Sequence, residues 1–112
     1  IEVNVSGEDT KHGCSPADFS SIAEAVTAST HLKFAGLMTV GLNSPAEADV
    51  RRGYALLREL RDTAAQQLAI PANQLELSMG MSQDLEWAIA EGATIVRVGT
   101  AVFGPRRSVA RG

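Results

Sequence analysis

The sequence predicts an α/β protein made of four successive βα units with parallel strands. A short apolar or β-branched run, a polar turn and a segment with helical spacing follow one another four times along the 112 residues. Hydrophobic residues make up 45% of the chain, which is enough for one small core and so for a single unit over residues 1–112. Strands separated by helices run parallel with right-handed crossovers, and both an open doubly wound sheet and an arc of a barrel satisfy this rule.

The first unit joins a strand at residues 1–6 to a helix that ends at about Ser29. Ser15 can cap this helix, Pro16 suits its first turn, and Asp18 favours the positive end of the helix dipole. The apolar face expected for the helix consists of Phe19, Ile22, Ala23 and Val26.

The second unit contains the longest predicted helix. Its strand spans about residues 32–40, and the segment Ser44-Pro45-Ala46-Glu47 predicts a capping box with proline at the first helical position. The helix carries an apolar stripe made of Tyr54, Leu57, Leu60, Ala64 and Leu68. Residues 71–73 (Pro-Ala-Asn) mark its end.

The third and fourth units are shorter. A strand at residues 75–79 leads through a glycine to a helix at residues 82–91, which Gly92 closes. The last strand spans residues 94–98 and is followed by Gly99 and Thr100. We expect residues 105–112 to form a loose tail.

Composition argues against several classes of protein. The net charge is -3 and no basic run is interleaved with aromatic residues, which disfavours nucleic acid as a partner. No stretch reaches the roughly 20 apolar residues of a membrane span. A single cysteine, Cys14, offers neither a disulfide nor a zinc site and predicts a reducing compartment such as the cytoplasm. No cluster of carboxylates and histidines suggests a metal site.

Three polar residues, Asn4, Ser78 and Arg97, interrupt otherwise apolar strands. Burying a polar group without a partner is costly, so each position needs a reason. Arg97 alternates with Ile95 and Gly99 and therefore points a permanent cation toward whatever the strands enclose. An internal ion pair with Glu76 and a role in binding a ligand are equally compatible with this pattern.

Two glycine turns at strand ends could bind phosphate. In residues 78–82, backbone amides and the Ser82 hydroxyl gather where a strand meets a helix, and Gly80 lets a ligand approach the backbone. The alternative is that Ser82 only caps its own helix. Gly99 and Thr100 close the next strand in the same way, and phosphate sites of (β/α) barrels commonly lie after the last two strands.

Four segments closely resemble the YggS/PROSC family of pyridoxal phosphate homeostasis proteins: residues 77–82 (LSMGMS), 96–104 (VRVGTAVFG), 36–38 (GLM) and 3–6 (VNVS). The resemblance covers nearly the whole chain. It implies a (β/α)8 TIM barrel of the alanine-racemase type, in which the four βα units of this chain would be strands five to eight. The chain would then be half of a barrel.

The resemblance also implies a site for pyridoxal 5'-phosphate, with no catalytic residue and no metal. Ser82 and the backbone around Gly80 and Met81, together with Gly99 and Thr100, would hold the phosphate. The remaining implied cofactor-binding residues are Arg97, facing the pyridine nitrogen, and Asn4 and Met38, lining the ring pocket.

A fixed cation beside the ring nitrogen disfavours its protonation and weakens the ring as an electron sink. This suits a non-catalytic carrier or buffer of the cofactor, which is what the family resemblance implies. The family's Schiff-base lysine lies on the first strand of the barrel, in the half that is not present here. Lys33 precedes the apolar part of its strand, at the wrong end for the site, and Lys11 lies in the loop after the first strand, on the correct face but in a solvent-exposed loop. Any cofactor binding by this chain is therefore expected to be non-covalent.

Two other functions remain open at this point. The chain could be a fragment of a pyridoxal-phosphate-dependent amino-acid racemase, although no second domain follows residues 103–104 to supply a tyrosine base. It could also be a structural half barrel without a ligand, pairing with itself as a dimer or with the missing N-terminal half. Open sheet edges and an open inner face favour such association.

Overall fold

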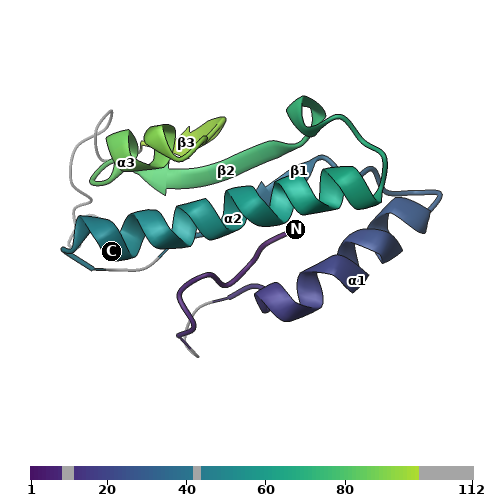
Figure 1. The fold of residues 1–112 in the computed structure, drawn as a ribbon, viewed down its shortest axis with the longest axis horizontal. Helices are drawn as coiled ribbons and strands as arrows, with labels where there is room; N and C mark the ends of the chain where they lie inside the picture. The colour runs from purple at the N-terminus through teal and green to yellow at the C-terminus, as the bar shows by residue number, and fades with distance from the viewer. Residues whose placement is uncertain (9–11, 42–43, 99–112) are drawn as a thin grey trace, which may run out of the picture.

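The computed structural model describes residues 1–8, 12–41 and 44–98. Its elements, in chain order, are α1 (Pro16–Ala28), β1 (Gly36–Met38), α2 (Glu47–Gln67), the 3-10 helix η1 (Ala72–Gln74), β2 (Glu76–Met81), α3 (Leu85–Ala90) and β3 (Ile95–Arg97). Figure 1 shows the long helix α2 across the middle of the molecule, with α1 on one side and the strands and α3 on the other.

The strands form one parallel sheet in the order β1-β2-β3. This confirms the parallel α/β class. The predicted strand at residues 1–6 is wrong in extent, because only a bridge between Glu2 and Met38 and another between Val3 and Cys14 form there. The Val3 amide donates to the Met38 carbonyl (2.8 Å), and the Met38 amide donates to the Ile1 carbonyl (2.9 Å). The described residues therefore contain three strands, and the N-terminal segment runs beside β1.

The strand boundaries also differ from those predicted. Residues 32–35 and 39–40 lie outside β1, which is only three residues long. In contrast, β2 extends two residues further than predicted, through Gly80 to Met81. The pairing of β2 with β3 shifts register between Ser78 and Met81, and this irregularity allows the strand to continue through the glycine.

The first helix forms as its sequence predicts, and the starts of the other two differ. The Ser15 hydroxyl caps α1 by accepting from the Asp18 amide (3.2 Å). No capping box forms at α2: Ala46 is its N-cap residue, and the Ser44 hydroxyl accepts from the Ala46 amide (3.1 Å). Within the described part of the chain, none of the helices has the length and apolar character needed to cross a membrane.

The core lies between the helices and one face of the sheet. Val3, Leu77 and Met79 are fully buried, so one face of the strands is covered. The predicted helix faces supply the other half of this core, and the buried side chains of that set are Phe19, Ala23, Tyr54, Leu57 and Ala64. The opposite face of the sheet is open, since Glu76 and Ile95 are exposed there.

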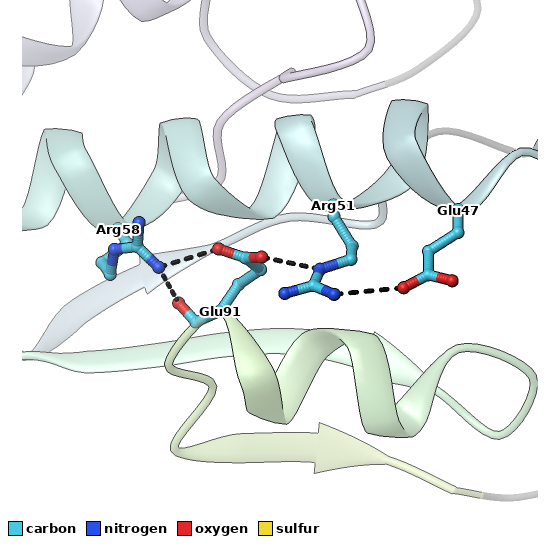
Figure 2. A network of polar contacts seen from close by, with 4 residues as sticks. All are labelled: Glu47, Arg51, Arg58 and Glu91. Carbon is cyan, nitrogen blue, oxygen red and sulfur yellow. Dashed lines mark hydrogen bonds and ion pairs between the residues drawn. The ribbon is translucent and has the colours of Figure 1, made fainter.

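A network of ion pairs joins α2 to the residue that follows α3. Glu91 accepts from Arg51 (2.7 Å) and from Arg58 (2.8 Å), and Arg51 also binds Glu47 (3.1 Å) (Figure 2). Arg58 donates in addition to the Glu91 backbone carbonyl (3.0 Å). The hydrogen bond from Arg51, more than that from Arg58, lowers the pKa of the Glu91 carboxyl. The side chain of Glu91 thus joins the third βα unit to the second.

Replacing Glu91 with glutamine is expected to lower the free energy of unfolding near neutral pH by about 1 kcal/mol, as for a favourable solvent-accessible ion pair. Because the folded pKa of Glu91 is depressed, its contribution is present above the unfolded pKa of about 4.3 and is lost as the pH falls through the folded pKa. Urea unfolding at a series of pH values measures this. The control is Glu86→Gln, which changes an exposed carboxylate on α3. Identical pH profiles for wild type and Glu91→Gln would contradict the prediction.

Candidate functional site

Arg97 lies at the end of β3 and reaches across the open face of the sheet. Its guanidinium donates to the Ser78 hydroxyl (2.9 Å) on β2 and to the Thr39 carbonyl (2.7 Å) just beyond β1. Both partners are uncharged. No ion pair joins Arg97 to Glu76 among the residues that the structure describes. The cation is therefore held in place without being neutralised, and its charge remains available to a ligand.

Register places Met38 on the same face as Arg97. In the parallel pairing Met38 lies opposite both Glu2 and Ser78, and residues paired in register point to the same side of a sheet. Met38 and Ser78 are half-buried, whereas Leu37 and Leu77, their neighbours along the strands, are buried against the helices. Met38, Ser78 and Arg97 therefore share the open face.

Asn4 lies at the carboxyl end of the N-terminal segment, where its side chain shapes a turn. Its amide group donates to the Glu8 carbonyl (2.9 Å), and its side-chain oxygen accepts from the Ser6 amide (3.2 Å), the Ser6 hydroxyl (2.9 Å) and the Gly7 amide (3.1 Å). A narrow crevice brings Asn4 together with Thr39, Val40 and other residues around them. Asn4 thus lies close to the carbonyl that holds Arg97, with its polar atoms engaged locally.

Gly80 and Met81 end β2, and Ser82 begins the turn that leads to α3. Gly80 has φ +103°, and a Cβ there would collide with the Ala88 side chain, so glycine is required by the close approach of α3 as well as by its positive φ. The Met81 amide, one of the expected phosphate donors, donates instead to the Asp84 carboxylate (2.8 Å). Ser82 is half-buried and lines an open depression of about 390 Å³ formed by residues 82–87.

The helix predicted at residues 82–91 is shorter in the structure, because Asp84 takes part in the turn that precedes it. Residues 82–84 form a turn, and α3 begins at Leu85. Asp84 is the N-cap residue, but its side chain reaches back to the Met81 amide and does not cap the helix. The alternative that Ser82 caps the helix is therefore wrong in position. Gly92 follows the helix with φ +105°, as predicted.

Tyr54 and Asp84 form a contact that sequence reasoning missed. The Tyr54 hydroxyl donates to the second carboxylate oxygen of Asp84 (2.7 Å). Tyr54 is fully buried, and burial, more than the hydrogen bond with Asp84, raises the pKa of its phenol, while the Arg97 cation acts in the opposite direction. The sequence carries no local signal for this contact, because the two residues are 30 positions apart.

Some predicted site residues cannot be placed in this arrangement. Gly99, Thr100 and the expected tail at residues 105–112 lie outside the described residues, as does Lys11. Lys33 is exposed and precedes β1, at the end of the sheet opposite to Arg97. Within residues 1–8, 12–41 and 44–98, no group of three His, Cys, Asp or Glu side chains could hold a metal ion.

The polar residues described above gather at the carboxyl ends of neighbouring parallel segments, where ligands of α/β proteins bind. Residues 1–107 match the alanine racemase N-terminal domain family. The chain belongs to this family. Its resemblance to the YggS/PROSC proteins is confirmed by curated relatives called pyridoxal phosphate homeostasis protein, which are 43% identical over 112 residues in Mus musculus and 46% identical over 106 residues in Pseudomonas aeruginosa.

Solved structures agree with this assignment of the family. The chain is 34% identical to PipY of Synechococcus elongatus without PLP, with a TM-score of 0.79 and 93% of the chain covered. It is 36% identical to PipY with PLP bound, with a TM-score of 0.71 and 85% of the chain covered. The chain spans 39% of the mouse relative, 44% of the Pseudomonas relative, and 48% and 44% of the two PipY chains.

Proposed function

We propose that this alanine racemase N-terminal domain family member binds pyridoxal 5'-phosphate at the carboxyl ends of its strands and acts as a non-catalytic carrier or buffer of the cofactor. The observation that carries the proposal is Arg97, a cation fixed by two neutral partners on the open face of the sheet. Relatives named as pyridoxal phosphate homeostasis proteins and the PipY structure with PLP bound support it.

The phosphate end of the cofactor would lie at the turn after β2. Ser82 and the backbone around Gly80 and Met81 would contribute there, joined by Gly99 and Thr100, which lie outside the described residues. Because the Met81 amide donates to Asp84, its contribution would be to shape the turn rather than to contact the phosphate. The depression of about 390 Å³ beside Ser82 leaves room for an anion.

The ring end would face Arg97, with Met38 and Asn4 at the edge of the pocket. When bound, pyridoxal phosphate supplies an aldehyde that reacts with amines and a ring that withdraws electrons. Arg97 stays protonated, and its hydrogen bonds to Ser78 and Thr39 keep the charge in one place. A cation beside the ring nitrogen disfavours protonation of that nitrogen, which weakens electron withdrawal and suits holding the cofactor rather than using it in catalysis.

The proposal also includes a partner that covers the open face of the sheet and completes the barrel. The N-terminal bridge to Met38 puts residues 1–4 where a fourth strand would lie, which fits half of a (β/α)8 barrel. Ile95 and Met81 are both 47% exposed, so the open face is partly apolar. We propose that an N-terminal half barrel, or a second copy of the chain in a dimer, covers this face. Lys33 precedes β1 at the opposite end of the sheet from Arg97, and Lys11 lies outside the described residues, so we propose that neither forms a Schiff base and that binding by this chain is non-covalent.

The test is a titration of the chain with pyridoxal phosphate, followed by the fluorescence of Trp87 with a correction for absorbance by the ligand. Saturable binding, with weaker binding of pyridoxal that lacks the phosphate, is expected because both ends of the ligand are recognised. Trp87 is the single tryptophan and lines the depression, so it reports on this site. No saturable binding would contradict the proposal and favour the structural half barrel. Turnover of alanine by the loaded protein would contradict the non-catalytic assignment.

A further inference from the structure

We infer that Tyr54 and Asp84 are positioning residues that fix the turn at the phosphate end of the site. This inference rests on the proposed function. Asp84 uses one carboxylate oxygen to accept from the Met81 amide (2.8 Å) and the other to accept from the Tyr54 hydroxyl (2.7 Å). One side chain therefore ties the turn after β2 to helix α2.

The anchor of this contact is rigid. Tyr54 is fully buried in the middle of the core, so its hydroxyl has little freedom to move. The loop after β1 also rests on its ring, because a Cβ at Gly41 would lie only 3.0 Å from the Tyr54 hydroxyl. Tyr54 thus contacts the loops that follow two neighbouring strands, and both loops lie at the end of the sheet where Arg97 is held.

The contact decides which backbone groups face a ligand. With the Met81 amide satisfied by Asp84, the turn is fixed in one conformation and Ser82 is presented at the depression. Without the carboxylate, the Met81 amide would have to find another acceptor, and the turn could take other conformations. Holding the turn before the ligand arrives reduces the entropy lost on binding. Tyr54 would therefore raise affinity without touching the ligand, and Asp84, which lines the depression, would do so by holding the turn.

Three variants test this role. Asp84→Ala removes both hydrogen bonds, and Tyr54→Phe removes one while keeping the ring; each should weaken pyridoxal phosphate binding roughly three- to tenfold. Asp84→Asn should bind within about threefold of wild type, because its oxygen can accept from Met81 and its amide can donate to the tyrosine oxygen. Asp62→Ala is the control, since it removes an exposed carboxylate on the same helix as Tyr54, about 12 Å further along its axis.

The comparison that separates positioning from general stability uses pyridoxal without its phosphate. Loss of affinity for pyridoxal phosphate, with the affinity for pyridoxal unchanged, is expected if the turn serves the phosphate end. Equal losses for both ligands, or an Asp84→Asn variant as weak as Asp84→Ala, would overturn the inference. Circular dichroism of each variant establishes that it is folded before its affinity is interpreted.

A second measurement needs no ligand. Tyr54 is the single tyrosine, so the ultraviolet absorbance of its phenolate reports on this residue alone. Asp84, which accepts from the Tyr54 hydroxyl, raises the pKa of the phenol, and the Arg97 cation on β3 lowers it. Asp84→Ala should lower the pKa of Tyr54, and an unchanged pKa, in proteins that circular dichroism shows to stay folded over the titrated range, would overturn the contact itself. If wild type binds no pyridoxal phosphate while this shift is seen, the proposed function fails and the Tyr54–Asp84 contact stands.

Discussion

Replacing Gly36 with alanine is expected to disrupt the pairing of β1 with β2 and to cost roughly 2 to 6 kcal/mol of stability, the sum of backbone strain and overpacking. Gly36 has φ +155°, and a Cβ there would lie 2.6 Å from the Glu76 amide nitrogen and closer still to the Glu76 carbonyl oxygen. Both are backbone atoms of the paired strand, so no side-chain rotation can relieve the clash. The strands would have to separate at the first residue of their register.

Thermal unfolding measures this effect, and Gly7→Ala provides a matched control. Gly7 also has a positive φ, +75°, but a Cβ there would meet nothing within 4 Å. Its substitution should therefore cost only the conformational penalty of about 1 kcal/mol. A fall in Tm for Gly36→Ala of at least about 8 °C, well beyond that of Gly7→Ala, is expected. Equal falls would show that β1 and β2 can move apart slightly without loss of stability, contrary to the prediction.

The helices and the core were predictable from local patterns. Ser15 followed by Pro16 and Asp18 specifies the start of α1, and these residues act there as expected. The apolar stripe of the long helix falls on its buried face, because residues spaced three and four apart lie on one side of any helix, whichever element packs there. Parallel pairing also followed, since each strand is separated from the next by a helix.

The strand limits were not predictable, because hydrogen-bond partners far along the chain set them. Residues 1–6 read as a strand, yet their backbone pairs with Met38 on one side and Cys14 on the other only as isolated bridges. The helix expected at residue 82 starts at Leu85 because Asp84 binds back to Met81. At Ser44 the hydroxyl closes a local turn, which competes with capping.

At the site, the sequence located individual residues but not their contacts. Arg97 stood out as a charge within a strand, and the structure supplies its two neutral partners, Ser78 and Thr39, which lie 19 and 58 residues away in the sequence. The Tyr54–Asp84 contact spans 30 residues and joins a residue of the predicted apolar stripe to an acidic residue within the predicted helix at residues 82–91. Each residue had a sufficient local explanation, which is why their joint role did not show in the sequence.

Replacing Arg97 with alanine is expected to weaken pyridoxal phosphate binding roughly ten- to hundredfold, the range for losing a hydrogen-bonding charged group at a ligand. The substitution removes a cation that crosses the open face and is held by Ser78 on β2 and by the Thr39 carbonyl just beyond β1. Arg97→Lys keeps the charge but cannot make both contacts with a planar fork, so its affinity should lie between those of wild type and Arg97→Ala. Titration followed by Trp87 fluorescence measures the series.

The matched control for this series is Arg52→Ala, which removes an arginine whose side chain is 75% exposed and which pairs with Asp49 on the same helix. It should bind as wild type does, because an exposed ion pair of this kind contributes little and lies on α2 rather than on the open face. If Arg97→Ala bound as tightly as Arg52→Ala, the cation would serve only to join β3 to β1 and β2. The ring end of the cofactor would then have to be recognised by other residues, and the weak electron withdrawal argued from Arg97 would lose its cause.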